Sequence, residues 1–238
     1  MQSGQSPVIC EEIHKQPRET HLKRIADSTV RRLSLYLRFL EDSTSGGLRT
    51  ISSEELARRG GTTSAQVRKD LSFFGSFGKR GLGYSVPELS SRLREILGLE
   101  REWRVIIVGA GKIGSALAQY RGFAQRGFVV TAVYDSSAAR IGGRCDGHLV
   151  RDVASLEADT AREAPDIAVL TVPAGDAQQV VDRLVAAGIR AILNFAPVQI
   201  QAPADVTIKT VNMAMELEGL SFALASRGAR DSEAPDED

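Results

Sequence analysis

A glycine-rich segment at residues 109–114 has the residue types and spacing needed to bind a phosphate. It directly follows an apolar run at residues 103–108 and reads Gly109-Ala110-Gly111-Lys112-Ile113-Gly114. Gly109 would allow a tight turn, Gly111 would let the backbone approach a pyrophosphate, and Gly114 would let a helix pack closely on a strand. The helix expected next, at residues 115 to about 126, would offer free backbone N–H groups to negative charge. The alternative is a tight strand–helix turn without a ligand.

The acid expected after such a turn is present. Asp135 ends a second predicted strand, at residues 129–134, about twenty residues beyond the glycines. Its carboxylate would accept hydrogen bonds from an adenosine ribose and repel a 2′-phosphate, which favours NAD(H) over NADP(H), although Arg140 lies nearby. NADH and NAD⁺ are therefore the expected cofactors.

Further strands and one helix complete a Rossmann-type parallel sheet. We predict strands at residues 167–171, 191–195 and 206–208, with a helix at residues 176–187. Thr171 and Asn194 would then lie at strand ends that border the nicotinamide end of the crevice. The alternative is that Pro173 and Pro197 simply end these strands.

A second group of polar residues suits DNA. Gln66, Arg68 and Lys69 are predicted to lie on the outer face of one short helix, where they could reach base edges and phosphates in a major groove. Lys79 and Arg80 stand between glycines and aromatic residues, which predicts a basic β-hairpin wing entering the minor groove. The alternative is a small helical domain that binds protein.

The elements that carry these residues form a winged helix-turn-helix. Apolar spacing predicts an amphipathic helix at residues 22–43. Ser52 with Glu55 and Thr63 with Gln66 form capping boxes that start helices at residues 53–59 and 63–74. In the last of these helices, the residues expected to face the core are Val67, Leu71 and Phe74.

The composition limits the class of protein. Hydrophobic residues make up 42% and charged residues 25% of the 238-residue chain, which is typical of soluble globular proteins. The longest apolar run is too short to cross a bilayer, and the N-terminus carries no signal-peptide core. Cys10 and Cys145 have no zinc-ligand spacing. We therefore expect a cytoplasmic protein with no metal site and no membrane association.

Charge is distributed unevenly although the net charge is zero. Residues 23–80 hold 12 Lys/Arg against 6 Asp/Glu, which favours a polyanionic partner for this segment or else a solvated surface. The last ten residues hold 5 acids and 1 arginine, as expected of a disordered acidic tail.

The segment after the sheet argues against an enzyme. One nearly all-apolar helix is predicted at residues 211–226, and no substrate domain or catalytic acid or base accompanies it. Such a helix must be buried on more than one side, which insertion into a second subunit achieves. The sequence therefore predicts a homodimer with no catalytic residues. The alternatives are an NAD-dependent oxidoreductase with an accessory helical domain, or a DNA-binding regulator that senses NADP(H) or another nucleotide.

The expected domain organisation follows from these segments. It comprises a disordered extension at residues 1–20, a winged-helix domain at 21–98 with its helix-turn-helix region at about 36–74, a Rossmann domain at 99–209, a swapped dimerisation helix at 210–227 and a disordered tail at 228–238.

Over about residues 33–225 the chain resembles the Rex family of bacterial redox-sensing transcriptional repressors. The most specific match is the run Val67-Arg-Lys-Asp-Leu-Ser72 leading into Gly78-Lys-Arg-Gly81. The other matches are Leu35-Tyr-Leu-Arg38, residues 74–84, the glycine-rich turn after its strand, Asn194-Phe-Ala-Pro197 and residues 211–224.

The resemblance implies a homodimer that binds a double-stranded inverted-repeat operator, releases it when NADH binds, and binds NAD⁺ without release. It also implies that the C-terminal helix is exchanged between subunits, with Tyr120 near the nicotinamide and Met213 inserted from the partner. Arg38 would approach position 212, which is typically Asp in the family. Asn212 here removes the charge of that ion pair and keeps an acceptor. The cofactor response is therefore expected to differ in strength, or to depend on packing around Tyr120 and Met213.

Overall fold

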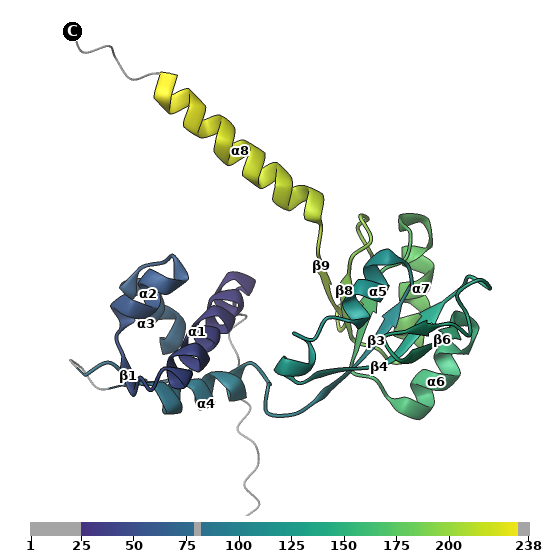
Figure 1. Ribbon diagram of the computed structural model, residues 1–238, viewed down its shortest axis with the longest axis horizontal. Helices are drawn as coiled ribbons and strands as arrows, with labels where there is room; N and C mark the ends of the chain where they lie inside the picture. Colours follow the sequence, from purple (N-terminus) through teal and green to yellow (C-terminus); the bar gives the residue numbers. More distant parts are fainter. Residues whose placement is uncertain (1–24, 79–81, 233–238) are drawn as a thin grey trace, which may run out of the picture. The chain divides into compact units, whose positions relative to one another are not determined.

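The computed structural model describes residues 25–78 and 82–232. The chain divides into two compact units, and the division falls between Leu97 and Gly98 (Figure 1). Among the described residues, no helix combines the length and the apolar character needed to cross a membrane.

The first unit contains the expected helix-turn-helix. Its described helices and strands are α1 (Asp27–Ser45), β1 (Thr50–Ile51), α2 (Ser53–Gly60), α3 (Ser64–Ser72), β2 (Tyr84–Ser85) and α4 (Val86–Ile96). Ser52 and Thr63 start α2 and α3, because each side-chain oxygen accepts the backbone N–H three residues on at 3.1 Å. Gly61, in the left-handed conformation at φ 59°, ends α2 and makes the tight turn between them.

Only one half of each predicted capping box forms. The Glu55 carboxylate binds Arg58 and Arg59 instead of reaching back to the backbone of Ser52. Likewise, the Gln66 amide donates to Asp70. In both cases the side chain is turned toward a charged partner, which makes a stronger hydrogen bond than the neutral backbone N–H of the cap residue.

The core of the first unit is built on α1 and α4, which lie against each other (Figure 1). α1 begins at Asp27, later than predicted, and Leu22 lies outside the described residues. Val30 is exposed because Thr29 takes the buried position of the first turn, with its hydroxyl 3.4 Å from Asp70. The buried apolar residues contributed by α1 and α4 are Leu33, Tyr36, Leu37, Leu40, Val86, Leu89 and Leu93.

The predicted wing lies partly outside the described residues, since Lys79 and Arg80 belong to the segment at 79–81. On either side of it, a Cβ on Gly78 would collide with the Gly83 carbonyl oxygen, so the two backbones nearly touch. After this close approach, β2 pairs with β1 in antiparallel fashion.

The second unit is a Rossmann-type sheet. Its described strands lie in the order β5 (Arg144–Cys145), β6 (His148–Asp152), β4 (Phe128–Asp135), β3 (Trp103–Val108), β7 (Ile167–Leu170), β8 (Ala191–Asn194) and β9 (Thr207–Thr210). All are parallel except β5, which pairs antiparallel with β6. Numbered along the chain, the parallel strands have the order 3-2-1-4-5-6, which reverses direction between β3 and β7.

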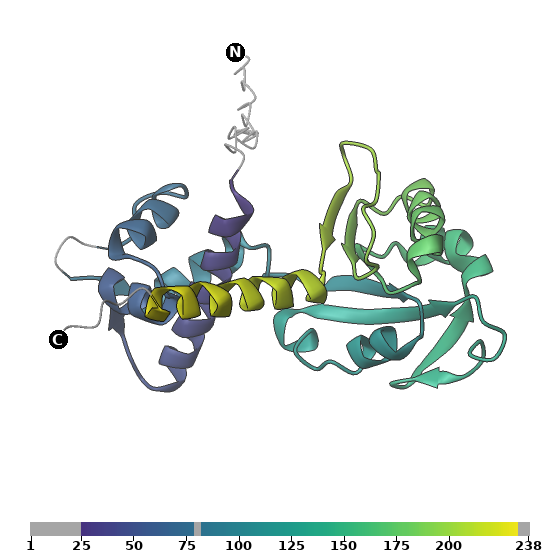
Figure 2. The ribbon, with the colours of Figure 1, turned by 90° about the horizontal axis from the view of Figure 1, so that it is seen from above.

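Helices cover both faces of this sheet. They are α5 (Lys112–Ala118), α6 (Leu156–Glu163) and α7 (Ala174–Ala186), with single turns η1 (Ala124–Arg126) and η2 (Val153–Ser155). Figure 2 shows the green helices α6 and α7 on one side of the strands and the teal helix α5 on the other. Each face of the sheet has its own hydrophobic core, and alternate residues of β3 pack into the two cores. Ile106 and Val108 lie in the core on the α6–α7 side, and Val105 and Ile107 lie in the core on the α5 side.

The first Rossmann helix is shorter than predicted. α5 starts at Lys112 and ends at Ala118, well before Arg126. The chain turns because the Tyr120 ring folds over Gly122, where a Cβ would be 2.5 Å from the ring, and meets Phe123 edge-on at 5.2 Å between ring centroids. β5, β6 and α6 were not predicted from the sequence.

The last helix, α8 (Met213–Ser232), starts two residues later than predicted. Asn212 is its cap, since Asn212 Oδ1 accepts the backbone N–H of Ala214 at 3.0 Å. Six large apolar side chains of α8 are more than half exposed, namely Met213, Met215, Leu217, Leu220, Phe222 and Leu224. None of the residues that the structure describes covers this apolar surface.

Candidate functional site

The glycine-rich turn joins β3 to α5, and its three glycines have different surroundings. Gly109 has φ 106°, and a Cβ there would be 2.6 Å from the carbonyl oxygen of Thr171. A Cβ on Gly114 would collide with the Gly109 carbonyl oxygen. Gly111, by contrast, has nothing within 4 Å of its Cβ position. Two glycines are therefore required for packing, and the third leaves the backbone open to an approaching molecule.

Thr171 holds the turn from the neighbouring strand. It follows β7, and its Oγ1 donates to the carbonyl oxygen of Gly109 at 2.7 Å. Its backbone N–H donates to Val108 at 2.9 Å, so the ends of β3 and β7 stay together at the point where strand order reverses. Ligands of open α/β sheets bind at this kind of position.

A cleft of about 560 Å³ opens at this point. Of the predicted cofactor residues, Gly109, Gly111, Asp135 and Thr171 line it. The residues contributed by the loop after β4 and by α7 with its N-terminal approach are Ser136, Ser137, Arg140, Val172, Pro173, Asp176, Gln179, Val180 and Arg183. The volume is in the range of small-molecule and cofactor sites.

The other predicted cofactor residues lie outside the cleft lining. They are Ala110, Lys112, Ile113, Gly114, Tyr120 and Met213. Ala110, Lys112 and Ile113 belong to the turn and the first residues of α5, while Tyr120 and Met213 are each 57% exposed.

Asp135 is buried beneath the turn. It is 6% exposed, its Oδ2 accepts the backbone N–H of Ala110 at 2.7 Å, and its Oδ1 accepts that of Ser137 at 2.7 Å. Arg140 lies 3.3 Å from Oδ2. The carboxylate thus fixes the glycine-rich turn, a role that the motif spacing alone does not reveal.

The outer face of α3 carries two of the predicted DNA-binding residues. Arg68 and Lys69 are exposed, and Arg68 donates to the hydroxyl of Ser53 at 2.9 Å. Gln66 instead turns inward and donates to Asp70 at 2.8 Å. Phe74 is only partly buried, whereas Val67 and Leu71 lie in the core as expected.

Asp70 is a fully buried carboxylate whose role was not predicted from the sequence. Arg32 donates to it from Nε at 2.6 Å and from a terminal nitrogen at 2.7 Å, and the Tyr36 hydroxyl donates at 3.0 Å. Burial alone would raise the pKa of Asp70, but the hydrogen bonds from Arg32, Gln66 and Tyr36 outweigh it and the pKa is lowered. The signal in the sequence is an acid inside the apolar stripe of a helix.

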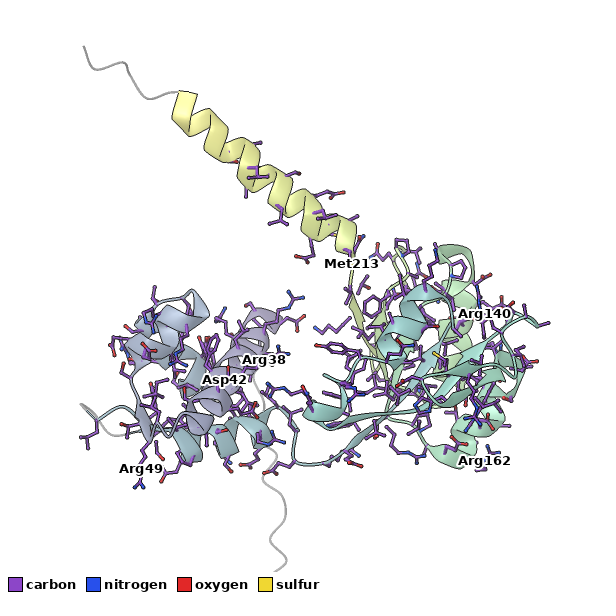
Figure 3. All side chains as sticks on the ribbon, in the orientation of Figure 1. Arg38, Asp42, Arg49, Arg140, Arg162 and Met213 are labelled. Carbon is purple, nitrogen blue, oxygen red and sulfur yellow. The ribbon has the colours of Figure 1, made fainter. Side chains whose placement is uncertain are left out.

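The predicted switch residues belong to different units. Arg38 is exposed on α1 in the first unit (Figure 3), whereas Asn212 and Tyr120 belong to the second. Elsewhere among the described residues, no three His, Cys, Asp or Glu side chains gather as a metal site would require. Cys145 is a buried free thiol.

A Rossmann cleft and a basic helix-turn-helix in one chain define the class of nucleotide-binding transcription regulators. Two family models match, "CoA binding domain" at residues 100–198 and "Putative DNA-binding protein N-terminus" at residues 24–72. The redox-sensing transcriptional repressor Rex of Syntrophomonas wolfei is 46% identical over 202 residues, covering 85% of this chain and 96% of that protein. That of Streptomyces coelicolor is 45% identical over 203 residues, covering 85% and 79%.

Solved structures agree with these matches. RSP, a Rex-family repressor, has a TM-score of 0.81 at 36% identity, covering 87% of this chain and 97% of its own. RSP in complex with beta-NAD⁺ and operator DNA has a TM-score of 0.82 at 37% identity, covering 89% and 99%. The chain belongs to the Rex family of redox-sensing transcriptional repressors.

Proposed function

We propose that this chain forms a dimeric repressor whose first unit binds an inverted-repeat operator and whose second unit binds NADH or NAD⁺, with NADH releasing the DNA. The observation that carries the proposal is the open backbone at Gly111, in a cleft at the point where the order of strands in the sheet reverses. The same chain also holds a basic helix-turn-helix. The relative RSP has been solved with beta-NADH and with beta-NAD⁺ plus operator DNA, which supports the same pair of ligands here.

In the second unit, the pyrophosphate would lie against the turn formed by Gly109, Ala110, Gly111, Lys112, Ile113 and Gly114. The adenosine end would lie toward Asp135 and the nicotinamide end toward Thr171. Asp135 ends β4 and Thr171 follows β7, and these two strands flank β3 and its glycine-rich turn on opposite sides. Tyr120 and the partner's α8, through Met213, would complete the nicotinamide side. The oxidation state of the bound cofactor would be the redox signal, and the residues named above would hold the cofactor in place.

In the first unit, Arg68 and Lys69 would contact DNA from α3, and Lys79 and Arg80 from the wing. Gln66 would contribute only its remaining amide groups, because one N–H is donated to Asp70. The buried Asp70 would hold α3 at a fixed angle to α1, so that the side chains of Arg68 and Lys69 reach the groove together.

We propose that α8 pairs the subunits. Its uncovered apolar side chains need a partner surface, and a second copy of the chain supplies one with twofold symmetry that suits an inverted repeat. Asn212 Oδ1 already caps α8, so an Arg38–Asn212 hydrogen bond would compete with the cap. The switch is therefore proposed to depend mainly on packing around Tyr120 and Met213.

We further propose a cytoplasmic regulator with no catalytic turnover. The rival function is an NAD-dependent oxidoreductase, and it would require turnover of an alcohol or hydroxy acid.

Fluorescence anisotropy of a labelled AT-rich inverted-repeat duplex tests the proposal, with NADH and NAD⁺ added separately at fixed salt. We expect NADH to release the duplex and NAD⁺ to leave it bound. Binding that ignores both nucleotides, or steady-state turnover of NADH with such substrates, would contradict the proposed function.

A further inference from the structure

Arg140 occupies the turn that follows Asp135 and lines the same cleft (Figure 3). Two hydrogen bonds hold the turn in place. The backbone N–H of Arg140 donates to the backbone carbonyl oxygen of Ser137 at 2.9 Å, and the backbone N–H of Ser137 donates to Oδ1 of the Asp135 carboxylate at 2.7 Å. Ser136 and Ser137 line the cleft beside it. A cation and two serines therefore stand at the end of β4, where Rossmann folds bind the adenosine ribose.

The guanidinium offsets the charge of Asp135. One terminal nitrogen of Arg140 lies 3.3 Å from Oδ2 and 3.5 Å from Oδ1 of that carboxylate. A ligand group approaching this end of the cleft therefore meets an ion pair, whose net charge is about zero, and not an isolated anion. Asp176, the other carboxylate among the described lining residues, belongs to α7 and not to this turn.

The side chains of Asp135 and Arg140 differ in how firmly they are held. Asp135 is held by two backbone N–H groups and its side chain is 6% exposed, whereas that of Arg140 is 52% exposed. Their 3.3 Å pair is also longer than the 2.6 Å pair of Arg183, another cleft arginine, with Glu157. Arg140 can thus turn toward an arriving anion while Asp135 stays in place.

We propose that Arg140 determines how strongly the cleft discriminates between NADH and NADPH, by offsetting Asp135 and pairing with the 2′-phosphate of NADPH. The inference rests on the proposed function, because it assumes that the cleft binds NADH. A 2′-phosphate is recognised well by a planar guanidinium, which can donate two hydrogen bonds to it. With Arg140 present, the preference for NADH is weaker than Asp135 alone would produce.

The test is the ratio of dissociation constants, Kd for NADPH over Kd for NADH, measured by nicotinamide fluorescence on the full chain. Arg140→Ala is compared with the wild type and with Arg144→Ala, a nearby arginine that donates to the carbonyl oxygen of Gly147 and does not line the cleft. We expect Arg140→Ala to raise the ratio about tenfold, the order of one charge-assisted hydrogen bond. NADH affinity should change by less than about threefold, since its adenosine ribose carries no phosphate, and Arg144→Ala should leave the ratio unchanged.

Salt gives a second measurement. Since screening weakens the charge interaction, high salt should reduce wild-type affinity for NADPH more than for NADH, and Arg140→Ala should lose this difference. A ratio unchanged in Arg140→Ala, or raised equally in Arg144→Ala, would overturn the inference while NADH binding left the proposed function intact. Absence of NADH binding by the folded wild type would instead overturn the proposed function, and the inference with it.

Discussion

At the scale of single residues, two buried carboxylates position the surfaces proposed to bind ligands. Asp135 ties the end of β4 to the glycine-rich turn through Ala110, and Asp70 ties α3 to α1 through Arg32 and Tyr36. Each therefore acts as a positioning residue. Removing either would change the shape of a binding surface as well as its charge.

Asp70 makes the first unit sensitive to acid. Because its pKa is lowered in the folded state, its stabilising contribution is complete above the ordinary Asp pKa, roughly 4, and is lost as pH falls through the lower folded-state pKa. Asp70→Asn should remove this pH dependence and destabilise the unit by about 3 kcal/mol, since it leaves the Arg32 cation unpaired. Urea unfolding followed by far-UV circular dichroism measures the effect.

Trp103, the single tryptophan, belongs to the second unit and provides the control. Its fluorescence transition should be the same in Asp70→Asn and wild type. Equal loss of stability by both probes would show that Asp70 does not act on the first unit specifically.

Two substitutions in the glycine-rich turn distinguish a glycine needed for packing from a glycine needed for binding. Gly114→Ala would force a Cβ into the Gly109 carbonyl oxygen, so it should destabilise the second unit by about 3 kcal/mol. A Cβ on Gly111 meets open space, so Gly111→Ala should fold normally. Because that Cβ would keep the pyrophosphate away from the backbone, the Kd for NADH should rise at least about tenfold. Thermal unfolding and NADH titration of both variants check this, and full NADH affinity in a folded Gly111→Ala would contradict the proposed position of the pyrophosphate.

At the scale of elements, the helix-turn-helix was predictable because Ser52, Thr63 and Gly61 mark its boundaries locally. The central strands were predictable because strands buried on both faces appear as short apolar runs. Other elements depend on tertiary contacts. α6 carries few apolar residues, and α5 ends where the Tyr120 ring folds over Gly122. The inward turn of Gln66 likewise depends on Asp70, which lies beside it only once α3 packs on α1.

The exposed face of α3 is expected to supply DNA affinity. Arg68→Ala and Lys69→Ala should each weaken operator binding about threefold to tenfold, and each should lower the slope of log affinity against log salt by about one. NADH affinity should be unchanged. Arg162→Ala on α6, an exposed arginine of the second unit, serves as the control and should leave both affinities intact. Loss of NADH binding in the α3 variants would contradict the assignment of the two functions to separate units.

The apolar surface of α8 is expected to hold the dimer together. Phe222→Glu places an unpaired charge in that surface, which is costly to bury, and should shift the protein to monomer at micromolar concentration. Sedimentation velocity measures this against Glu218→Gln, which removes a charge from the same helix and should remain dimeric. A dimer that persists in Phe222→Glu would show that another surface joins the subunits.

At the scale of the whole molecule, the proposed function requires coupling between the unit that binds DNA and the unit that binds NADH. A ligand shifts a conformational equilibrium only through its different affinities for the two states. Under the proposed function, NADH therefore favours the arrangement of the dimer that binds DNA poorly, and α8 is the element proposed to join the two subunits.

The most direct test of this coupling is the affinity for NADH measured with and without saturating operator duplex. Because coupling between two ligands is reciprocal, operator should weaken NADH binding by the same factor by which NADH weakens operator binding, of order 5- to 150-fold. A matching factor in the two directions is the result that the account predicts. An NADH affinity that stays the same when the operator is bound would contradict it.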